Sequence, residues 1–491
     1  MPTRLRLQDL AGRAPLGLAL FAAAIGVGCA RFSPDAGMFV VESAASAELG
    51  KDVTKIRSEG DAAAVSARIR GLLAKPPNVS AAVQIALINN RGLQAAFNEL
   101  GISEAEMVEA SFPSPPTLSL RQIVGSGGFE IERQILQNVL ALLTLPRRRE
   151  IAEARFRQAQ ARAVDTTLRI AMEAARAYYR AVAANEAVWF LEESRLSAEA
   201  VSDVAKQLGE TGAMPKLDQA REHVFYAEVS GQVGIARLRQ RSERERLIRA
   251  LGLWGSETKF ALPRRLAALP SRPRSLASVE QEAVLRRADL VIARTELDIL
   301  ALELGLTRKT RFIDALAVAG ISKTEKDVIA NGSQAEVDQI RRGGFELDVQ
   351  IPIYDFGETR VRRAEETYMQ AVNRLLDRAI TVRSEAREAY QNYRGTYDIA
   401  RHYEHEILPL RQIISDETML NYNAMIKDLF ALLGEARARI TANVQAIEAR
   451  RDFWLATVDL QAAIIGGRGT EETTTMSSTG ALAGASQRDA H

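Results

Sequence analysis

Gly-Gly-Phe-Glu occupies residues 127–130 and occurs again at residues 343–346. Two further segments repeat in the same order along the chain. Residues 173–178 match residues 385–390, and Gly212-Ala213-Met214 matches Asn423-Ala424-Met425. The copies lie 211 to 216 residues apart, so each half carries a strand-like segment, a long helix and a break at nearly the same spacing. This pattern indicates a tandem duplication with a period of about 200 residues.

Length and charge limit the class of protein. A chain of 491 residues ordinarily folds as several domains, but the repeat predicts one body built from two similar halves. The formal net charge is only +2, and Lys and Arg are interspersed with Asp and Glu along helical stretches. We interpret these charges as solvated helix faces, and the composition gives no indication of nucleic-acid binding.

The N-terminus has the pattern of a secretory signal, which we place at residues 1–28. Arg4, Arg6 and Arg13 precede an apolar stretch that ends at Gly28 and is short for a membrane span. Outside this segment, no apolar run reaches the roughly 18 to 20 residues of a membrane-spanning helix. Any membrane span of the mature chain is therefore expected to consist of strands.

Cys29 follows the apolar stretch and is the sole cysteine, so it cannot form an intramolecular disulfide. Its setting resembles a bacterial lipoprotein signal, although Gly26 stands where that pattern usually has Leu. The resemblance implies acylation of Cys29 and, with Ala30 as the next residue, sorting to the outer membrane. The alternatives are ordinary signal-peptide cleavage and a buried cysteine in an uncleaved segment.

A long segment, residues 147–208, contains neither Gly nor Pro and is rich in strong helix formers. It predicts one helix of about 60 residues, on the order of 90 Å long. Apolar residues recur at seven-residue steps, and the second half repeats this register. The positions are Phe156, Ala163, Ile170, Ala177, Ala184 and Leu191, then Tyr368, Leu375, Val382 and Ala389. The spacing is typical of coiled-coil packing, and a solvent-exposed stalk is the alternative.

Each long helix is expected to end at a break and to be followed by a returning helix. Gly209, Gly212 and Pro215 form the first break, after which residues 216–252 resume a helix. The second break spans residues 421–427. Pro409 precedes it and is expected to kink or locally unwind the helix.

These features divide the chain into six segments. Three prolines mark a linker between the halves, and the Thr-, Ser-, Ala- and Gly-rich end of the chain is expected to be disordered. The predicted segments are a signal (1–28), a segment of extended chain and short helices (29–80), the first repeat (81–254), the linker (255–275), the second repeat (276–465) and the tail (466–491).

The clearest strand is residues 345–351, in which apolar and polar residues alternate without a fault. This places Phe345, Leu347, Val349 and Ile351 on one face, toward lipid or a core. We expect a partner strand at 311–321, across a polar loop. In the first half, residues 117–124 and 129–135 form the equivalent hairpin, although Arg133 falls on its apolar face. The sequence leaves the state of residues 136–145 open.

Four strands in one chain cannot close a barrel, and open strand edges do not survive in the hydrocarbon region of a membrane. If these hairpins enter a membrane, several chains must complete the sheet. The alternative is a small soluble sheet that caps the long helices.

Together, these residues resemble the TolC family, the outer-membrane channel subunits of tripartite bacterial efflux systems. The resemblance covers about residues 81–466 and rests on three motifs, their order and their duplication. The motifs are Ala-Leu-Ile-Asn-Asn at 86–90, Phe-Pro-Ser-Pro-Pro-Thr-Leu at 112–118 and Val-Gln-Ile-Pro-Ile-Tyr-Asp-Phe-Gly at 349–357. The lipoprotein-like start is similar to the lipoprotein branch of the family.

The resemblance implies a mainly α fold with a small β part. It implies a homotrimer in which long helical hairpins form an α-barrel and four strands per chain contribute to a shared twelve-stranded barrel in outer-membrane lipid. Such a duct conducts passively. Its partners are a periplasmic adaptor, which docks on the helix tips, and an inner-membrane pump.

The resemblance also points to the two breaks as the docking tips. The residues there are Gly212, Ala213 and Met214 in the first half and Asn423, Ala424, Met425 and Ile426 in the second, where the family's glycine is missing. Some relatives narrow the tip with aspartates, but residues 431–434 are Ala-Leu-Leu-Gly here. A polar latch among Lys216, Asp218, Lys427, Asp428 and Glu435 is one hypothesis, and solvated helix-end charges are the alternative.

Enzymatic function is not indicated, because the sequence has no phosphate-binding loop with Lys, no His-Glu-x-x-His and no cysteine pair. His402 and His405 have helical spacing, but on a charged helix we interpret them as solvated and predict neither a metal nor a cofactor. The competing function is a periplasmic coiled-coil lipoprotein that acts as a scaffold or binding protein without a pore.

Overall fold

A computed structural model of the protein describes residues 32–125, 128–275, 278–331 and 334–467. The predicted signal, Cys29 and nearly all of the predicted tail lie outside these ranges. The chain divides into two compact units. Within the described residues, unit 1 comprises 32–37, Glu99–Gln160 and Ala293–Arg374, and unit 2 comprises Met38–Asn98, Ala161–Ile292 and 375–467. Among the described residues, no helix is both long and apolar enough to cross a membrane.

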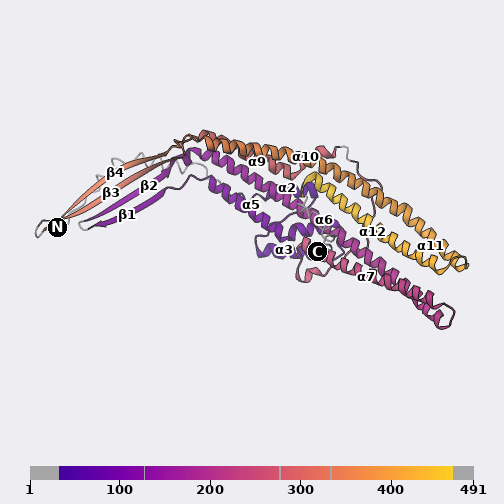
Figure 1. Ribbon diagram of the computed structural model, residues 1–491. Coiled ribbons are helices and arrows are strands. Elements are labelled where there is room, and N and C mark those ends of the chain that lie inside the picture. The colour runs from indigo at the N-terminus through magenta and orange to yellow at the C-terminus, as the bar shows by residue number, and fades with distance from the viewer. Residues whose placement is uncertain (1–31, 126–127, 276–277, 332–333, 468–491) are drawn as a thin grey trace, which may run out of the picture. The chain divides into compact units, whose positions relative to one another are not determined.

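Unit 1 contains an antiparallel sheet of four strands within the described residues (Figure 1). Its strands are β1 (Thr117–Gly125), β2 (Gly128–Asn138), β3 (Ala315–Asn331) and β4 (Gln334–Gln350), in that order across the sheet. The two predicted hairpins are confirmed, and β2 and β3 join them edge to edge. In the single chain, β1 and β4 therefore remain as the sheet edges.

The second hairpin differs from the prediction. The polar segment expected as a loop is strand, because β3 continues to Asn331 and β4 begins at Gln334. A strand ladder is made by backbone groups, so polar side chains do not prevent it when one face is solvated. Lys323 and Glu325 alternate with their neighbours and pair with charges on adjacent strands, at 3.2 Å to Glu130 and 3.9 Å to Arg342.

The predicted strand start at Arg311 is also wrong, because the backbone of Arg311 packs against the turn that follows β4. Phe356 and Gly357 both have positive φ, at 48° and 74°. A Cβ on Gly357 would lie 2.1 Å from the Arg311 carbonyl oxygen, so only glycine fits there. This turn starts α10 (Glu358–His402).

The first long helix, α6 (Val139–Glu210), confirms the predicted helix and extends it toward the sheet. It begins directly after β2 and continues through Pro146, which resolves the open segment 136–145 into strand and then helix. The predicted seven-residue seam of α6 is buried from Ala163, at 4% exposure, to Leu191, at 5%, and Phe156 at its start is only partly buried. In unit 1, Ile151 and Ala154 of α6 pack against Ile299 of α9 (Ala288–Lys309).

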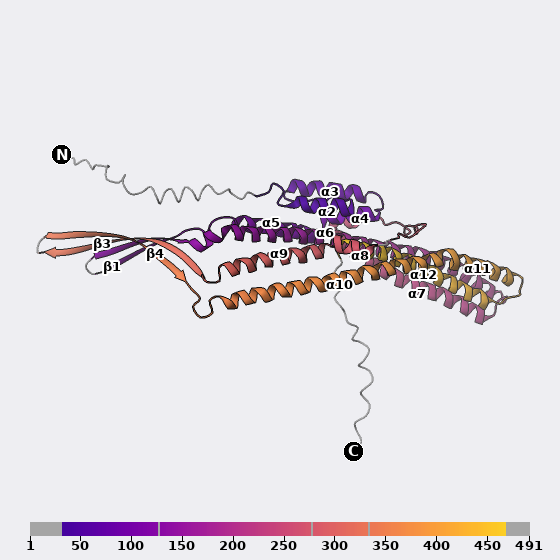
Figure 2. The same ribbon diagram turned by 90° about the horizontal axis from the view of Figure 1, so that it is seen from above.

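Unit 2 contains two helical hairpins. The first joins the end of α6 to α7 (Lys216–Leu251), and the second joins α11 (Leu408–Asn423) to α12 (Leu429–Ile465), which run side by side (Figure 2). The effect predicted for Pro409 is confirmed. The helix widens into a π turn at Tyr403–Ile407 immediately before this proline.

The first described residues of unit 2 form α2 (Met38–Leu49), α3 (Glu59–Leu73) and α4 (Val79–Asn89), and α5 (Arg91–Ala110) begins there. Asn89 and Asn90 explain one motif of the sequence, because they hold the end of α7. The Asn89 amide donates to the carbonyls of Leu251 and Gly252 at 3.2 and 2.7 Å. The Asn90 amide donates to Ala250 at 3.1 Å, so the carbonyls that helix geometry leaves unpaired are satisfied.

The Pro-rich linker of unit 2 is fixed by side chains from the long helices. It contains η1 (Gly255–Thr258) and leads to α8 (Val279–Arg286). The Trp454 indole donates to Ala267 at 3.0 Å, and the Tyr397 hydroxyl donates to Pro270 at 3.1 Å. Trp454 also stacks on Tyr179 with ring centroids 5.3 Å apart, so an aromatic cluster and the linker stabilise the same part of the unit.

Candidate tips and membrane-facing surface

The predicted apolar face of β4 is solvent-exposed in the single chain. Phe345 is 85% exposed, Leu347 59%, Val349 40% and Ile351 52%. Strand pairing continues this face across the sheet, since Phe345 lies beside Gly320, which lies beside Ile135. Further exposed apolar residues on the same face are Leu118, Leu120, Val124, Ile135 and Val318. A patch of this extent on one sheet face marks a surface for lipid or protein.

The opposite face of the sheet carries charges at one level of all four strands. Arg121, Glu132, Lys323 and Arg342 lie directly beside one another in the register. Arg121 and Lys323 approach Glu132 at 3.9 and 3.6 Å. This alternation of an apolar and a charged face suits a sheet between lipid and water. Arg133 lies on the apolar face as predicted, with its guanidinium 3.4 Å from the Thr324 hydroxyl.

The first tip is a compact turn between α6 and α7. Gly212 takes a left-handed conformation with φ of 74°. The Leu208 carbonyl accepts hydrogen bonds from Ala213 at 2.8 Å and from Met214 at 3.2 Å, which closes the end of α6. Pro215 then precedes α7.

The second tip repeats this hydrogen-bond pattern, but in a different register from the sequence match. The Asn421 carbonyl accepts from Ile426 at 2.9 Å and from Lys427 at 3.2 Å. The residue equivalent to Gly212 is therefore Met425, with φ of 61°, rather than Asn423. The sequence match of residues 212–214 with residues 423–425 is therefore two residues out of the structural register. No glycine marks the left-handed position in the second half. Methionine rarely adopts this left-handed conformation, so the backbone at the second tip is strained. The Met425 side chain is 94% exposed.

The five charges considered for a latch do not pair with one another in the described part of the chain, and Glu435 pairs with Arg411 of α11 at 3.1 Å. Asp218 pairs with Arg221 of its own helix at 3.0 Å. Asp428 caps α12, because its carboxylate accepts the Ala431 amide at 3.0 Å. Lys216 opens α7, and Lys427 lies in the turn before Asp428.

Other residues, which the sequence analysis missed, join the two hairpins near the tips. The Arg221 guanidinium lies 3.4 Å from the centroid of the Phe430 ring. Arg437 of α12 pairs with Glu228 of α7 at 2.9 Å. Beneath these contacts, a small core combines residues of three helices: Ala198 of α6, Phe225 and Val229 of α7, and Leu433 of α12. Long-range pairs of this kind leave no local pattern in a sequence.

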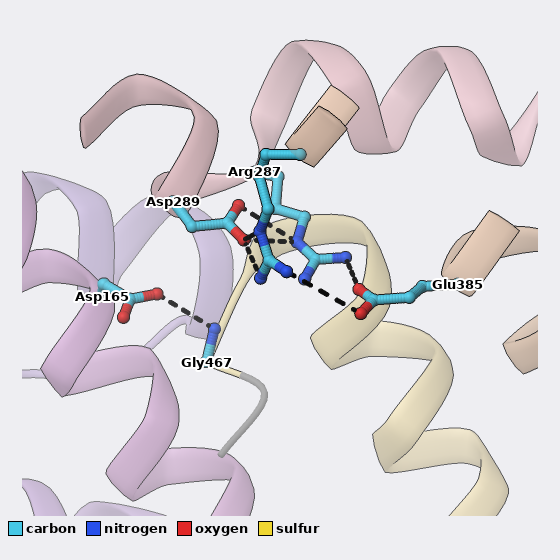
Figure 3. Close-up of polar contacts among 6 residues, drawn as sticks. Asp165, Arg287, Asp289, Glu385 and Gly467 are labelled. Atoms are coloured by element: carbon cyan, nitrogen blue, oxygen red, sulfur yellow. Dashed lines mark hydrogen bonds and ion pairs between the residues drawn. The ribbon is translucent and has the colours of Figure 1, made fainter. Parts of the chain in front are cut away.

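A second cluster lies deep in unit 2, where Arg287 follows α8 (Figure 3). Arg287 is 1% exposed and pairs with Asp289 at 3.1 Å and with Glu385 of α10 at 2.5 Å. Arg378 also pairs with Asp289, at 2.5 Å. Glu385 is the first residue of the repeated segment 385–390, so the sequence repeat includes one residue of this cluster. The network ties α10 to the start of α9.

The end of α12 is attached beside the same cluster. The Asp165 carboxylate of α6 accepts the Gly467 amide at 3.2 Å (Figure 3). A Cβ on Gly467 would lie 2.6 Å from the Arg169 amide nitrogen, so the chain passes close to α6 only because this residue is glycine. Burial raises the pKa of Asp165, and the Gly467 amide opposes this effect.

The histidines considered for a metal have ordinary surroundings. His402 Nδ1 lies 3.0 Å from the Glu406 carboxylate one turn later, and both side chains are more than half exposed. Across the described ranges, no group of three or more His, Cys, Asp or Glu side chains is arranged to hold a metal ion.

No protein-family model matches the sequence, and no curated protein matches it. Solved structures do match. CusC, whose crystal structures concern transmembrane channel formation, aligns with a TM-score of 0.65 over 79% of this chain and 92% of CusC, at 15% identity. The CmeC outer-membrane channel of Campylobacter jejuni aligns with a TM-score of 0.64 over 79% of this chain and 85% of CmeC, at 16% identity.

The outer-membrane protein VceC of Vibrio cholerae aligns with a TM-score of 0.63 over 79% of this chain and 96% of VceC, at 13% identity. The chain has the fold of an outer-membrane channel. This channel fold is mainly helical with a four-stranded sheet, as the sequence predicted. The alignments extend over most of each solved chain, so the sheet and the helical hairpins belong to one shared architecture.

Proposed function

We propose that three copies of this chain form an outer-membrane exit duct that conducts substrates passively. The observation that carries this proposal is the sheet of the channel fold, which has one exposed apolar face and edges at β1 and β4. Unpaired strand edges are costly in lipid, and closure into a barrel removes them. Three sheets of four strands give a shared barrel of twelve, with the charged face toward water. Cys29, once acylated, adds a lipid anchor in the outer membrane.

The helices of unit 2 support assembly with further copies. One apolar set lies exposed on α6 and α7, and another lies on α10 and α11. They comprise Leu196, Val204, Ile235 and Leu238 on the first pair, and Leu376, Ile380, Ile399 and Ile413 on the second, each more than half exposed. Two different apolar surfaces on one chain suit a head-to-tail contact, which closes into a ring when the rotation between copies is 120° for a trimer.

We further propose that the duct serves a tripartite efflux system. An inner-membrane pump supplies the energy, and a periplasmic adaptor docks on the tips at Gly212, Ala213 and Met214 and at Asn423, Ala424, Met425 and Ile426. The exposure of Met425 and Ile426, at 94% and 71%, supports docking by apolar contact. Apolar side chains that are this exposed at a turn gain most from burial against a partner.

Met425→Asp is expected to reduce export by at least about tenfold, because an interface residue of this kind contributes 1.4 kcal/mol or more when it is buried. Export is measured in cells whose efflux depends on this protein, and conductance of the purified variant is measured in planar bilayers. If the adaptor docks at Met425, this variant loses export but keeps the conductance of the wild type.

The matched control is Leu285→Asp on α8, which alters an apolar residue that is 64% exposed and lies outside the tips. Export at the wild-type level is expected for this variant. Equal export by Met425→Asp and the wild type would contradict docking at the second tip, and the duct itself would still be tested by conductance.

A further inference from the structure

Glu222 is a buried carboxylate near the first tip, in the second turn of α7. Glu222 is 1% exposed, and both of its carboxylate oxygens are buried without a hydrogen-bond partner among the described residues. An ionised carboxylate in such a place loses its hydration and gains no donor in return. Burial therefore raises the pKa of Glu222. Neither the repeat nor the proposed docking explains why an acid occupies this position.

The groups around Glu222 come from three helices. On α7 itself, His223 is the next residue, and its Nδ1 lies 2.5 Å from the Ser202 hydroxyl of α6. From α12, Arg437 lowers the pKa of Glu222 but is paired with Glu228. The acid of α6 in this region, Glu199, is paired with Arg195 at 2.9 Å. Burial raises the pKa of Glu222 more than Arg437 and His223 lower it, and neither of these residues donates a hydrogen bond to the carboxylate.

Glu222 lies three and seven residues before Phe225 and Val229, so it shares their face of α7, which packs against Ala198 of α6 and Leu433 of α12. Another face of α7 borders an open space. A hollow of about 180 Å³ lies between α7 and α12, and its lining includes Leu217, Val224, Phe430 and Arg437. The contacts that cross it are the Arg221–Phe430 stack and the half-exposed Arg437–Glu228 pair. Exposed ion pairs contribute little, about 0–1 kcal/mol. The buried face of α7 that carries Glu222 therefore largely determines whether α7 and α12 remain packed together.

We propose that Glu222 is a proton-operated latch of the tips. When its carboxyl group is neutral, α7 packs against α6 and α12 as in this structure. When it ionises, the charge favours a state in which α12 moves away and the carboxylate meets water or Arg437. This inference rests on the proposed duct, whose periplasmic entrance lies at the tips, and it makes the opening of that entrance dependent on pH.

The direction of the pH effect follows from linkage. Packing raises the pKa of Glu222, so the packed state binds the proton more tightly than the separated state. The stability of the packed tips is complete below the pKa of the separated state and is lost as pH rises through the pKa of the packed state. Acid therefore keeps the tips packed, and alkali loosens them.

The test measures the distance between spin labels on the two tips, at Thr211→Cys and Asn423→Cys, in the full-length assembled protein. Both positions are exposed. Between about pH 4 and pH 9, the range that spans free and buried Glu, the wild-type distribution is expected to move to longer distances. Glu222→Gln, which has the same shape and stays neutral, is expected to keep the acid distribution throughout.

The matched control is Glu210→Gln, an exposed acid at the end of α6, which is expected to respond to pH like the wild type. Glu222→Met is a second neutral variant, with the same expectation as Glu222→Gln in case one of them folds poorly. Identical pH responses in the wild type and both neutral variants would overturn the latch, as would a wild type that does not respond. The labels report the tips whether or not the protein conducts, so a failed latch and a failed duct give different results.

Discussion

Val349→Asp is expected to prevent assembly of the protein in the outer membrane. Val349 lies on the apolar face of β4, next to the sheet edge, and is 40% exposed in the single chain. In the proposed barrel, a charge at this position meets lipid in each of three copies, at a cost that depends on its depth in the bilayer. We expect about a tenfold or larger loss of assembled protein, because every 1.4 kcal/mol changes an equilibrium tenfold.

The matched control is Gln350→Asp, one residue further along the same strand and on the opposite, water-facing side. It adds the same charge and is expected to assemble normally. The measurement is the amount of detergent-extracted oligomer recovered from outer-membrane fractions. A scaffold without a barrel predicts no difference between the two variants, so equal recovery would favour that alternative.

Arg287→Met is expected to cost about 3–5 kcal/mol of stability, since it removes one partner from a buried ion pair and leaves carboxylates uncompensated. The side chain is 1% exposed, and it bridges Asp289 and Glu385. Arg378 also contacts both acids and partly compensates, which favours the lower end of this range. The measurement is the thermal unfolding midpoint of the assembled protein.

Arg286→Met provides the control for this prediction. Arg286 is the neighbouring residue and pairs with Glu48, but its side chain is 46% exposed. Such a pair contributes about 0–1 kcal/mol, so the midpoint should hardly change. Equal midpoints for the two variants would mean that the network around Arg287 does not hold α10 in place.

The sequence predicted the long helices, the two breaks and one strand with good boundaries because these depend on local properties. Helix propensity and the absence of Gly and Pro specify α6, and strict alternation specifies the end of β4. The polar part of the second hairpin was missed, since Lys323 and Glu325 face water and pair across strands. Such residues have the composition of a loop until their neighbours are known.

The candidate sites were harder to predict because they depend on contacts between distant segments. Glu222 has the appearance of an ordinary helix-surface acid in the sequence, but it is buried in the fold, on the face of α7 that carries Phe225 and Val229. The second tip lies where the sequence placed it, but the tripeptide match is two residues out of the structural register, because Met425 rather than Asn423 occupies the left-handed position. Arg287 and its partners likewise meet only in the folded unit.

The most direct test of the duct is single-channel conductance in planar bilayers, on a purified sample whose oligomeric mass is measured at the same time. The account predicts discrete conductance from a particle with the mass of three chains, and larger conductance when Arg437→Ala weakens the contact between α7 and α12. A monomer would contradict it, as would a trimer that stays silent both as the wild type and as Arg437→Ala. Either result would favour a periplasmic scaffold without a pore.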